Sequence, residues 1–438
     1  MDAMAPMPAG PSRRIPGFRW VVAGLLLFST LLSYLHRQTF AVAAPAIQEQ
    51  FGLTNADIAH ILNGFMIAYA VMHPVAGRII DRLGTRVGLA VAVSFWSLAN
   101  AAHALAGGLW SFTSARLLFG IGAAGNFPAA IKTVSEWFPP RERTFATGIL
   151  NIGSSAGAVI APPLVILLIL SFGWRTSFVV TGAMGLIWVA LWLLLYHPPS
   201  QHPRVTPEEL HRIREEDAGP AEDEVMLRGA WKEALRSRNL WVLMASRLIS
   251  DPTWFVYLNW LPIYLRQARG FSLESIACSA WIPYMGGILG SVLGGLLSLQ
   301  LVRSGYTVLE ARKIALGLCA SVMPILILAA RAHSAVTTLT LITIATVAAQ
   351  AWAASALTLS ADLLPKRIVA MAYGLTGMCG MLSAAFFNWV VGQITHDPGG
   401  FLYVFTIVGF LHPAAALLIV LLIRPPPVAA AKAASAIQ

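Results

Sequence analysis

The sequence predicts an all-α membrane protein with twelve transmembrane helices in two halves of six, and with both chain ends in the cytoplasm (N-in/C-in). Three observations support this fold class. The 438 residues are 57% hydrophobic and only 11% charged, whereas soluble domains carry about 25% charged residues; the mean hydropathy is +0.68. Twelve apolar runs are long enough to cross a bilayer. The one long hydrophilic segment falls in the middle of the chain.

The apolar runs follow one another with short polar connections, as expected for helices of about 20 residues that cross a membrane repeatedly. Several runs are longer than that, which implies tilt or extension beyond the bilayer. The first run is too long for a cleaved signal, and no small-residue cleavage site closes it. In order, the predicted spans are 20–46, 56–79, 87–107, 110–136, 144–171, 175–197, 239–267, 274–302, 310–331, 335–362, 367–394 and 400–424.

Basic residues predict the orientation. Of the 30 Lys and Arg residues, 23 fall in segments that are cytoplasmic if both chain ends lie inside the cell, as the positive-inside rule requires. The net charge of +10 then reflects topology and anionic lipid headgroups, and requires no nucleic acid partner. The three cysteines lie in apolar spans, so we expect neither a disulfide nor a metal site. We expect a monomeric, multi-pass protein of the inner (plasma) membrane.

The hydrophilic segment divides the chain. A six-loop-six layout is typical of transporters whose two halves rock about a central site. Within the loop, residues 206–217 are predicted to form a short amphipathic surface helix and AGPAEDE a flexible linker, and we interpret the loop as a tether. The expected parts are a cytoplasmic N-terminal tail at 1–19, a first half at 20–197, a central cytoplasmic loop at 198–238, a second half at 239–424 and a C-terminal tail at 425–438.

Few ionisable groups fall inside the apolar runs. Asp251 is the only acidic residue well inside any of them. An ionisable side chain in hydrocarbon costs from about 2.5 kcal/mol upward, so each such residue is a candidate for function. The basic or titratable residues at membrane depth are His36, Arg37, His73, Arg116 and Arg247. His103 and His412 are assigned to the neighbourhood of span ends, where we expect solvated or interfacial histidines.

Two short motifs stand in the first half. GRIIDRLGTR, at 77–86, joins spans 2 and 3, and Arg116 in span 4 is followed by small residues at a spacing that permits tight helix packing. Together with the six-plus-six layout, these motifs resemble two signatures of the major facilitator superfamily and imply its fold. The gating or structural residues that we assign are Gly77, Asp81, Arg82, Arg86, Arg116 and, one turn before Asp251, Arg247.

Most of the chain also resembles the anion:cation symporter family, in its hexuronate and aldonate branch. The similarity covers spans 1 to 11 and rests on segments such as YLHRQTFAVAAPAI (34–47), GNFPAAIKTVSEWFPPRER (125–143), SDPTWFVYLNWLPIYL (250–265) and DLLPKR (362–367). Members of that family import sugar acids and other organic carboxylates with protons. The resemblance therefore implies a secondary transporter without a cofactor, with a small organic anion, a proton and membrane lipids as partners.

Arg37 matches the family's helix 1 arginine, so the resemblance assigns it the substrate carboxylate. A guanidinium in a low-dielectric cavity suits a bidentate carboxylate contact; the alternative is an arginine bonded to backbone carbonyls. Two acidic positions that carry protons in the family are changed, with His36 and Ala123 in their place. Other departures that make the site less polar or less acidic are His73, Ile263, Ala349, Ala353 and Ser355.

Three interpretations of coupling remain open. His36 can replace the missing carboxylate, because an imidazole titrates near pH 6.5, and a bound anion would relieve its repulsion from Arg37. Alternatively, His36 is a neutral hydrogen-bonding residue and the protein is a facilitator or an anion exchanger. In the third interpretation Asp251 or an unrecognised ion carries the coupling. We interpret the i, i+4 pair of Arg247 and Asp251 as structural, with conformational switching as the alternative.

Polar and aromatic residues on several spans can complete a sugar-acid site, because hydroxyl-rich ligands are held by amides and hydroxyls beside aromatic faces. For each residue an ordinary interhelical hydrogen bond is an equally good explanation. Asn151, Gln350 and Asn388 match polar positions of the family pattern. Besides Arg37, the candidate substrate-binding residues are Tyr34, Tyr69, His73, Asn151, Ser154, Tyr257, Gln350, Trp352 and Asn388.

Other classes of function have little support. The sequence contains no GxSxG, no HExxH, no paired intramembrane aspartates and no nucleotide-binding loop, so we expect no catalytic residues and no enzyme. A nutrient sensor on a transporter scaffold would more often carry a substantial soluble extension. An aromatic or short-chain acid remains an alternative substrate to a hexuronate or an aldonate.

Overall fold

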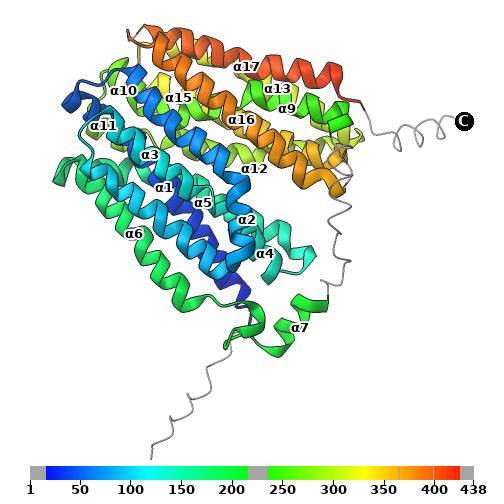
Figure 1. Ribbon diagram of the computed structural model, residues 1–438. Helices are drawn as coiled ribbons and strands as arrows, with labels where there is room; N and C mark the ends of the chain where they lie inside the picture. Colours follow the sequence, from blue (N-terminus) through cyan, green and yellow to red (C-terminus); the bar gives the residue numbers. More distant parts are fainter. Residues whose placement is uncertain (1–15, 216–234, 365, 398, 425–438) are drawn as a thin grey trace, which may run out of the picture.

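The computed structural model describes residues 16–215, 235–364, 366–397 and 399–424, and its regular elements are helices (Figure 1). The first 15 residues, the AGPAEDE linker and the C-terminal tail at 425–438 lie outside the described residues. The first half contains α1 (Arg19–Phe51), α2 (Asn55–Ala102), η1 (His103–Leu105), α3 (Leu109–Ala123), α4 (Asn126–Trp137), α5 (Pro140–Phe172) and α6 (Trp174–Leu195).

The central segment contributes η2 (Pro199–Gln201) and α7 (Pro207–Glu215). The second half contains α9 (Arg238–Ser250), α10 (Pro252–Gln267), α11 (Leu273–Ser279), α12 (Ile282–Arg303), α13 (Val308–Val322), α14 (Ile325–Arg331), α15 (Ala335–Leu363), α16 (Lys366–Ile394) and α17 (Gly400–Leu422).

The twelve predicted crossings are confirmed. Ten helical stretches among the described residues are long and apolar enough to span a membrane. One of them, Asn55–Leu105, has 51 residues and holds two crossings, because the chain turns back at Gly84, where φ is 74°. A further crossing is divided between α9 and α10, each of which is too short to span alone.

Several crossings are interrupted where the sequence analysis predicts continuous helices. The breaks between α9 and α10 and between α13 and α14 fall at Pro252 and Pro324, which cannot donate a backbone hydrogen bond. Conversely, the segment 77–86, which joins spans 2 and 3, is more regular than a loop. It is helical except at Gly84, whose positive φ suits glycine and reverses the chain within one residue.

Glycines set the closest helix contacts in each half. Gly153 and Gly157 of α5 lie directly against the α1 backbone, and an added methyl group would overlap carbonyl oxygens of α1. In the second half, Gly290 and Gly294 of α12 lie against the α15 backbone in the same way. Small residues of this kind let membrane helices approach closely where no hydrophobic effect drives them together.

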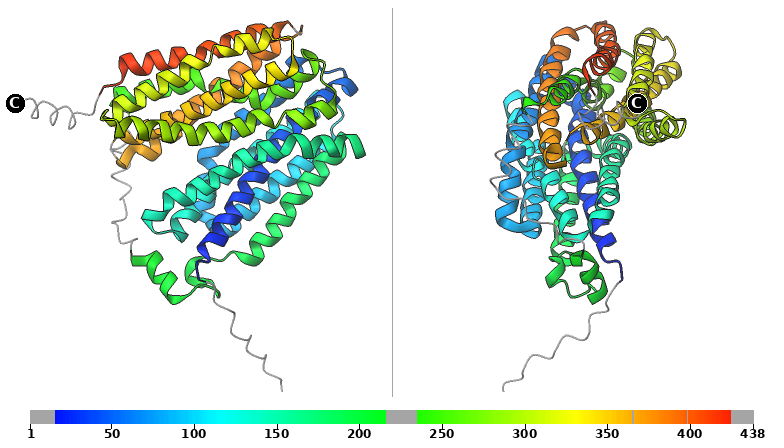
Figure 2. Two further views of the ribbon diagram at one scale, coloured as in Figure 1. Left: turned by 180° about the vertical axis from the view of Figure 1, so that it is seen from behind. Right: turned by 90° about the vertical axis from the view of Figure 1, so that its right-hand side faces the viewer.

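The two six-helix bundles meet at one end and diverge toward the other (Figures 1 and 2). Between described residues, most hydrogen bonds that join the halves lie where α1 ends and α2 begins. The Asn55 amide donates to Gln267 Oε1 (3.0 Å) and to the Thr395 carbonyl (2.6 Å), and Gln267 donates to Gln48 Oε1 (3.3 Å). Since α1 begins and α17 ends at the opposite end, the halves are joined at the end far from the described chain ends.

Helix α7 is bonded to the first half at the diverging end. The Glu209 carboxylate accepts hydrogen bonds from the backbone N–H groups of Gly17, Phe18 and Arg19 at 3.1, 3.1 and 3.2 Å. These are the unpaired donors at the start of α1, where a negative charge is favourable. The Arg19 guanidinium also bonds Glu209 and, on α5, Glu142. The surface helix predicted at 206–217 is therefore present and docked on α1 and α5.

We expect Gly157→Ala to destabilise the protein by an amount on the order of 1–3 kcal/mol, because the added methyl group forces α5 away from α1. The measurement is the apparent melting temperature of the purified protein in detergent. Gly148→Ala on the same helix is the matched control, because a methyl group there meets nothing within 4 Å. Equal melting temperatures for the two variants would contradict this account of the α1–α5 contact.

Candidate functional site

Arg37 lies near the middle of α1, enclosed by aromatic rings. Its side chain is buried, and the guanidinium carbon stands 4.7 Å from the ring centres of both Tyr34 and Phe65 and 5.3 Å from that of Tyr69. A guanidinium over aromatic faces gains cation–π attraction, which is stronger when water is excluded. We call Tyr34, Phe65 and Tyr69 the aromatic cage.

Arg37 has no ion-pair partner among the described residues, and its Nε has no hydrogen-bond partner there. A second buried guanidinium lies nearby. Arg116 of α3 donates from Nη2 to the Arg37 carbonyl (3.1 Å) and stands over the rings of Phe40 (4.5 Å) and Phe65 (5.6 Å). Two positive charges therefore share the Phe65 ring without a described carboxylate beside them, so this region attracts an anion.

The predicted residues of α2 lie beside Arg37. Phe65, Tyr69 and His73 follow at helical spacing, with ring centres 5.5 and 5.4 Å apart, so they form one aromatic column along α2. His73 is half-buried, and its Nδ1 has no partner among the described residues. The structure thus brings Arg37, Tyr34, Tyr69 and His73 together.

His36 points away from the aromatic cage. Its ring is buried between α1 and α6, with Nε2 only 2.7 Å from the Thr181 carbonyl oxygen. A carbonyl oxygen only accepts, so Nε2 carries the proton and donates it. His36 Nδ1 has no partner among the described residues, so a second proton would find no acceptor there. Proton transfer by His36 stays a prediction.

Asn388 and Tyr257, predicted on the second half, lie at the junction with the first. Asn388 Oδ1 accepts from Trp260 Nε1 (2.9 Å) and from Asn259 (3.3 Å), and its amide nitrogen reaches Met66 Sδ on α2 (3.2 Å). The hydroxyl of Tyr257 is buried beside the Thr346 side chain, outside hydrogen-bond geometry. Asn388 is therefore engaged in joining the halves, whereas Tyr257 is not satisfied in this way.

Other predicted residues lie apart from the aromatic cage. Trp352 packs into the second half, with its ring 5.1 Å from that of His412 on α17. Gln350 is half-buried and lies against Gly287 of α12. On α5, Asn151 is exposed and Ser154 donates to its carbonyl at 2.7 Å. The expectation that His103 and His412 are solvated is wrong, since both are buried against aromatic rings, and His412 lies in the middle of α17 and not near its end.

Asp251 lies at the break between α9 and α10. Arg247 donates to its Oδ2 from Nη2 (2.6 Å) and Nε (2.9 Å), so the predicted i, i+4 pair has formed. Gly380 of α16 lies directly against this carboxylate, and a methyl group at Gly380 would overlap it. The structural role of the Arg247–Asp251 pair stays a prediction, and so does the alternative that the pair breaks when the protein changes conformation.

The motif at 77–86 lies at the diverging end of the first half. Asp81 is exposed and pairs with Lys132 of α4 (2.7 Å), and Arg86 donates to the Leu193 carbonyl of α6 (2.7 Å). Arg82 is exposed and Gly77 has open space around it. These contacts tie α2 to α4 and α6, and the gating role stays a prediction.

The sequence analysis missed Gln38. This residue is 1% exposed at the centre of α1, and both its amide atoms lack a hydrogen-bond partner among the described residues. The available signal was an amide next to Arg37 in the middle of an apolar span.

A pocket of about 390 Å³ lies away from Arg37, between α5 and Trp281. It is lined almost wholly by apolar side chains and offers no charge for an anion.

Residues 26–388 match the family described as Major Facilitator Superfamily. The chain belongs to the major facilitator superfamily. It is 34% identical over 397 residues to the hexuronate transporter of Escherichia coli K12, covering 90% of this chain and 92% of that protein. It is 38% identical over 283 residues to the galacturonate transporter of Dickeya chrysanthemi, covering 64% of this chain and 82% of that protein.

Solved structures agree on the fold. A bacterial homolog of the human lysosomal transporter Spinster, in an inward-facing and unoccupied conformation, has a TM-score of 0.73 at 18% identity, covering 93% of this chain and 95% of that one. The inward-open xylose transporter XylE of E. coli has a TM-score of 0.69 at 14% identity, covering 93% and 97%. The protein is thus a multi-pass inner-membrane transporter and not an enzyme.

Proposed function

We propose that this protein imports an organic carboxylate, a sugar acid such as a hexuronate or an aldonate, by alternating access, and that Arg37 binds the carboxylate. The observation that carries the proposal is the buried Arg37 guanidinium, which has an aromatic cage and no carboxylate partner among the described residues. The named transport of hexuronate and galacturonate by the two relatives supports the same substrate class.

The chemistry of the cage fits such a ligand. A guanidinium presents parallel N–H donors that match both oxygens of a carboxylate, and the pair gains strength where water is excluded. The aromatic faces of Tyr34 and Tyr69 suit the C–H faces of a sugar, and their hydroxyls suit its hydroxyl groups. In addition, an anion at Arg37 would offset the charge of Arg116 behind it.

We further propose that both chain ends are cytoplasmic, as the distribution of basic residues predicts. The end at which the halves diverge then faces the cytoplasm, and this conformation corresponds to an inward-open state. Access from outside requires the bonds of Asn55, Gln48 and Gln267 to break. These bonds join uncharged amides, so they separate at less cost than buried ion pairs.

For the coupling, we propose proton symport as the first candidate, with His36 or Asp251 as the titrating group. A second candidate is anion exchange or facilitation, which the His36 geometry favours because its Nε2 already donates to Thr181 in the α1–α6 interface. In an exchanger, the empty carrier would hold Arg37 and Arg116 without a counter-charge, and its return would be disfavoured.

Arg37→Lys should lower the affinity for galacturonate about 10- to 100-fold, because a charge-assisted hydrogen bond contributes about 1.5–3 kcal/mol and the bidentate contact is lost. Arg37→Ala should bind no galacturonate. The measurement is isothermal titration of purified protein, with Arg303→Ala, an exposed arginine, as the control. Unchanged affinity in Arg37→Ala with a normal melting temperature would refute the assignment.

Closing the joined end covalently should stop transport. In a variant without Cys278, Cys319 and Cys379, we expect a short bifunctional thiol reagent to block uptake into proteoliposomes when it links Gln48→Cys to Gln267→Cys across the halves. The matched control links Gln48→Cys to Asn55→Cys, which lie in the same half and are also in contact. Undiminished uptake after complete cross-linking of the first pair would argue against alternating access at this end.

If His36 carries the proton, an inside-alkaline gradient should stimulate uptake in the unmodified protein, His36→Gln should lose that stimulation while exchange survives, and His36→Asp should keep it. The measurement is radiolabelled uptake into proteoliposomes with and without internal substrate. Stimulation that persists in His36→Gln but not in Asp251→Asn assigns the proton to Asp251. Uptake that ignores the gradient and requires internal anion supports exchange.

A further inference from the structure

Gln38 is a buried amide without a partner. Its side chain is 1% exposed, and neither Oε1 nor Nε2 has a hydrogen-bond partner among the described residues. An unsatisfied buried polar group is costly, and the great majority of buried side-chain polar atoms in proteins are paired. An amide in this position therefore calls for a donor and an acceptor that a ligand or water supplies.

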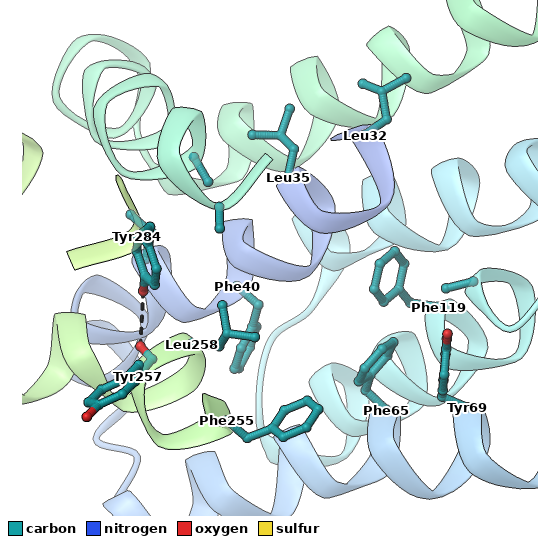
Figure 3. Packing of buried hydrophobic residues seen from close by; sticks show 14 of the residues in the cluster. Leu32, Leu35, Phe40, Phe65, Tyr69, Phe119, Phe255, Tyr257, Leu258 and Tyr284 are labelled. Carbon is teal, nitrogen blue, oxygen red and sulfur yellow. Dashed lines mark hydrogen bonds between the residues drawn. The ribbon is translucent and has the colours of Figure 1, made fainter. Parts of the chain in front are cut away.

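The described residues around Gln38 cannot supply both a donor for Oε1 and an acceptor for Nε2. The Tyr284 hydroxyl of α12 lies beside it, outside hydrogen-bond geometry. Tyr284 donates its only proton to the Tyr257 carbonyl of α10 at 3.0 Å, a bond drawn in Figure 3. Tyr284 can consequently accept from the Gln38 amide nitrogen after a small adjustment, but it cannot donate to the carbonyl oxygen. In either case no described residue donates to Gln38 Oε1.

Gln38 and Arg37 point to different sides of α1. They are neighbours on α1 and so project about 100° apart around its axis, and Tyr34 lies one turn before both. Arg37 turns toward α2 and the aromatic cage, whereas Gln38 turns toward α10 and α12 of the second half. In Figure 3, Phe65 and Tyr69 lie at the right of the picture and Tyr257 and Tyr284 at the left.

We propose that Gln38 is a subsite that hydrogen-bonds the hydroxyl groups of the substrate, and that it makes the protein selective for polyhydroxylated acids over hydroxyl-free carboxylates. This inference rests on the proposed function. A ligand whose carboxylate is at Arg37 extends its hydroxylated chain toward the second half. Each ligand hydroxyl both donates and accepts, which matches an amide that needs a donor for Oε1 and an acceptor for Nε2.

The selectivity has a physical basis. A site built to hydrogen-bond a hydroxyl discriminates strongly against an analogue without it, because the buried polar groups of the protein are then left unpaired. A purely apolar pocket would discriminate far less. Gln38 thereby separates hexuronates and aldonates from aromatic and short-chain acids, which the sequence leaves as alternatives.

The test is isothermal titration of the purified full-length protein with galacturonate and with cyclohexanecarboxylate, a six-membered-ring acid without hydroxyl groups. Gln38→Met keeps the length of the side chain and removes its hydrogen-bonding groups. We expect it to weaken galacturonate binding about tenfold or more and to leave cyclohexanecarboxylate within about twofold, so that the preference collapses. Gln300→Met, at an exposed glutamine on α12, is the control and should change neither.

The other outcomes are distinct. If Gln38→Met keeps the preference, the amide is satisfied by water or by Tyr284 and the subsite is refuted; a loss of melting temperature shared by Gln38→Met and Tyr284→Phe would identify the Tyr284 case. If the unmodified protein binds both acids equally, hydroxyl selectivity is refuted while carboxylate binding stands. If it binds neither acid, the proposed function fails and the subsite with it. Arg37→Lys distinguishes carboxylate binding from hydroxyl recognition, because it should weaken the binding of both acids alike.

Discussion

Two buried guanidinium groups that share one aromatic ring constrain the rest of this structure. Arg37 and Arg116 both stand over Phe65, and Arg116 reaches the α1 backbone at the Arg37 carbonyl. Burying a charge without a counter-charge is expensive, and cation–π contacts offset only part of that cost. The hydrogen bond from Arg116 also ties α3 to the middle of α1. The first half is therefore held together around a region that an anion would stabilise.

The second half neutralises its membrane-depth arginine in another way. Asp251 neutralises Arg247 within the same crossing, and Asn388 accepts from Asn259 and Trp260. The positive charge that an anion would offset thus lies in the first half, and uncharged hydrogen-bonding groups lie in the second half. A sugar acid has the same division, since its charge is at one end and its hydroxyls follow along the chain. This correspondence links the proposed function to the proposed role of Gln38.

Movement between the halves is compatible with the contacts that join them. The bonds of Asn55, Gln48 and Gln267 are between amides, and an ion pair described there, Glu49 with Arg266, is exposed at 3.8 Å. Exposed pairs contribute little, typically about 0–1 kcal/mol. By contrast, glycine contacts such as Gly157 against α1 are tight and lie within one half. These contacts are compatible with the proposed alternating access, in which the halves move as rigid bodies while their junction separates.

The sequence by itself determined the twelve crossings and the few residues at which charge enters the membrane, because hydrophobicity and the cost of burying charge are properties of short segments. Arg37 could be singled out on that ground, and so could the pair of Arg247 with Asp251, whose i, i+4 spacing brings the side chains together within one helical turn. The short helix of the central loop also followed from its local pattern.

Only the tertiary structure decided which way each side chain points and what it meets there. His36 and Arg37 are adjacent in the chain, yet one lies against Thr181 of α6 and the other in the aromatic cage of α1 and α2. His103 is buried although it lies at a span end, His412 is buried in the middle of α17, and Gln38 is unsatisfied because no described donor reaches its carbonyl oxygen. The physical reason is that the surroundings of a side chain depend on which helices pack against its side of the helix, and the sequence of one helix does not specify its neighbours.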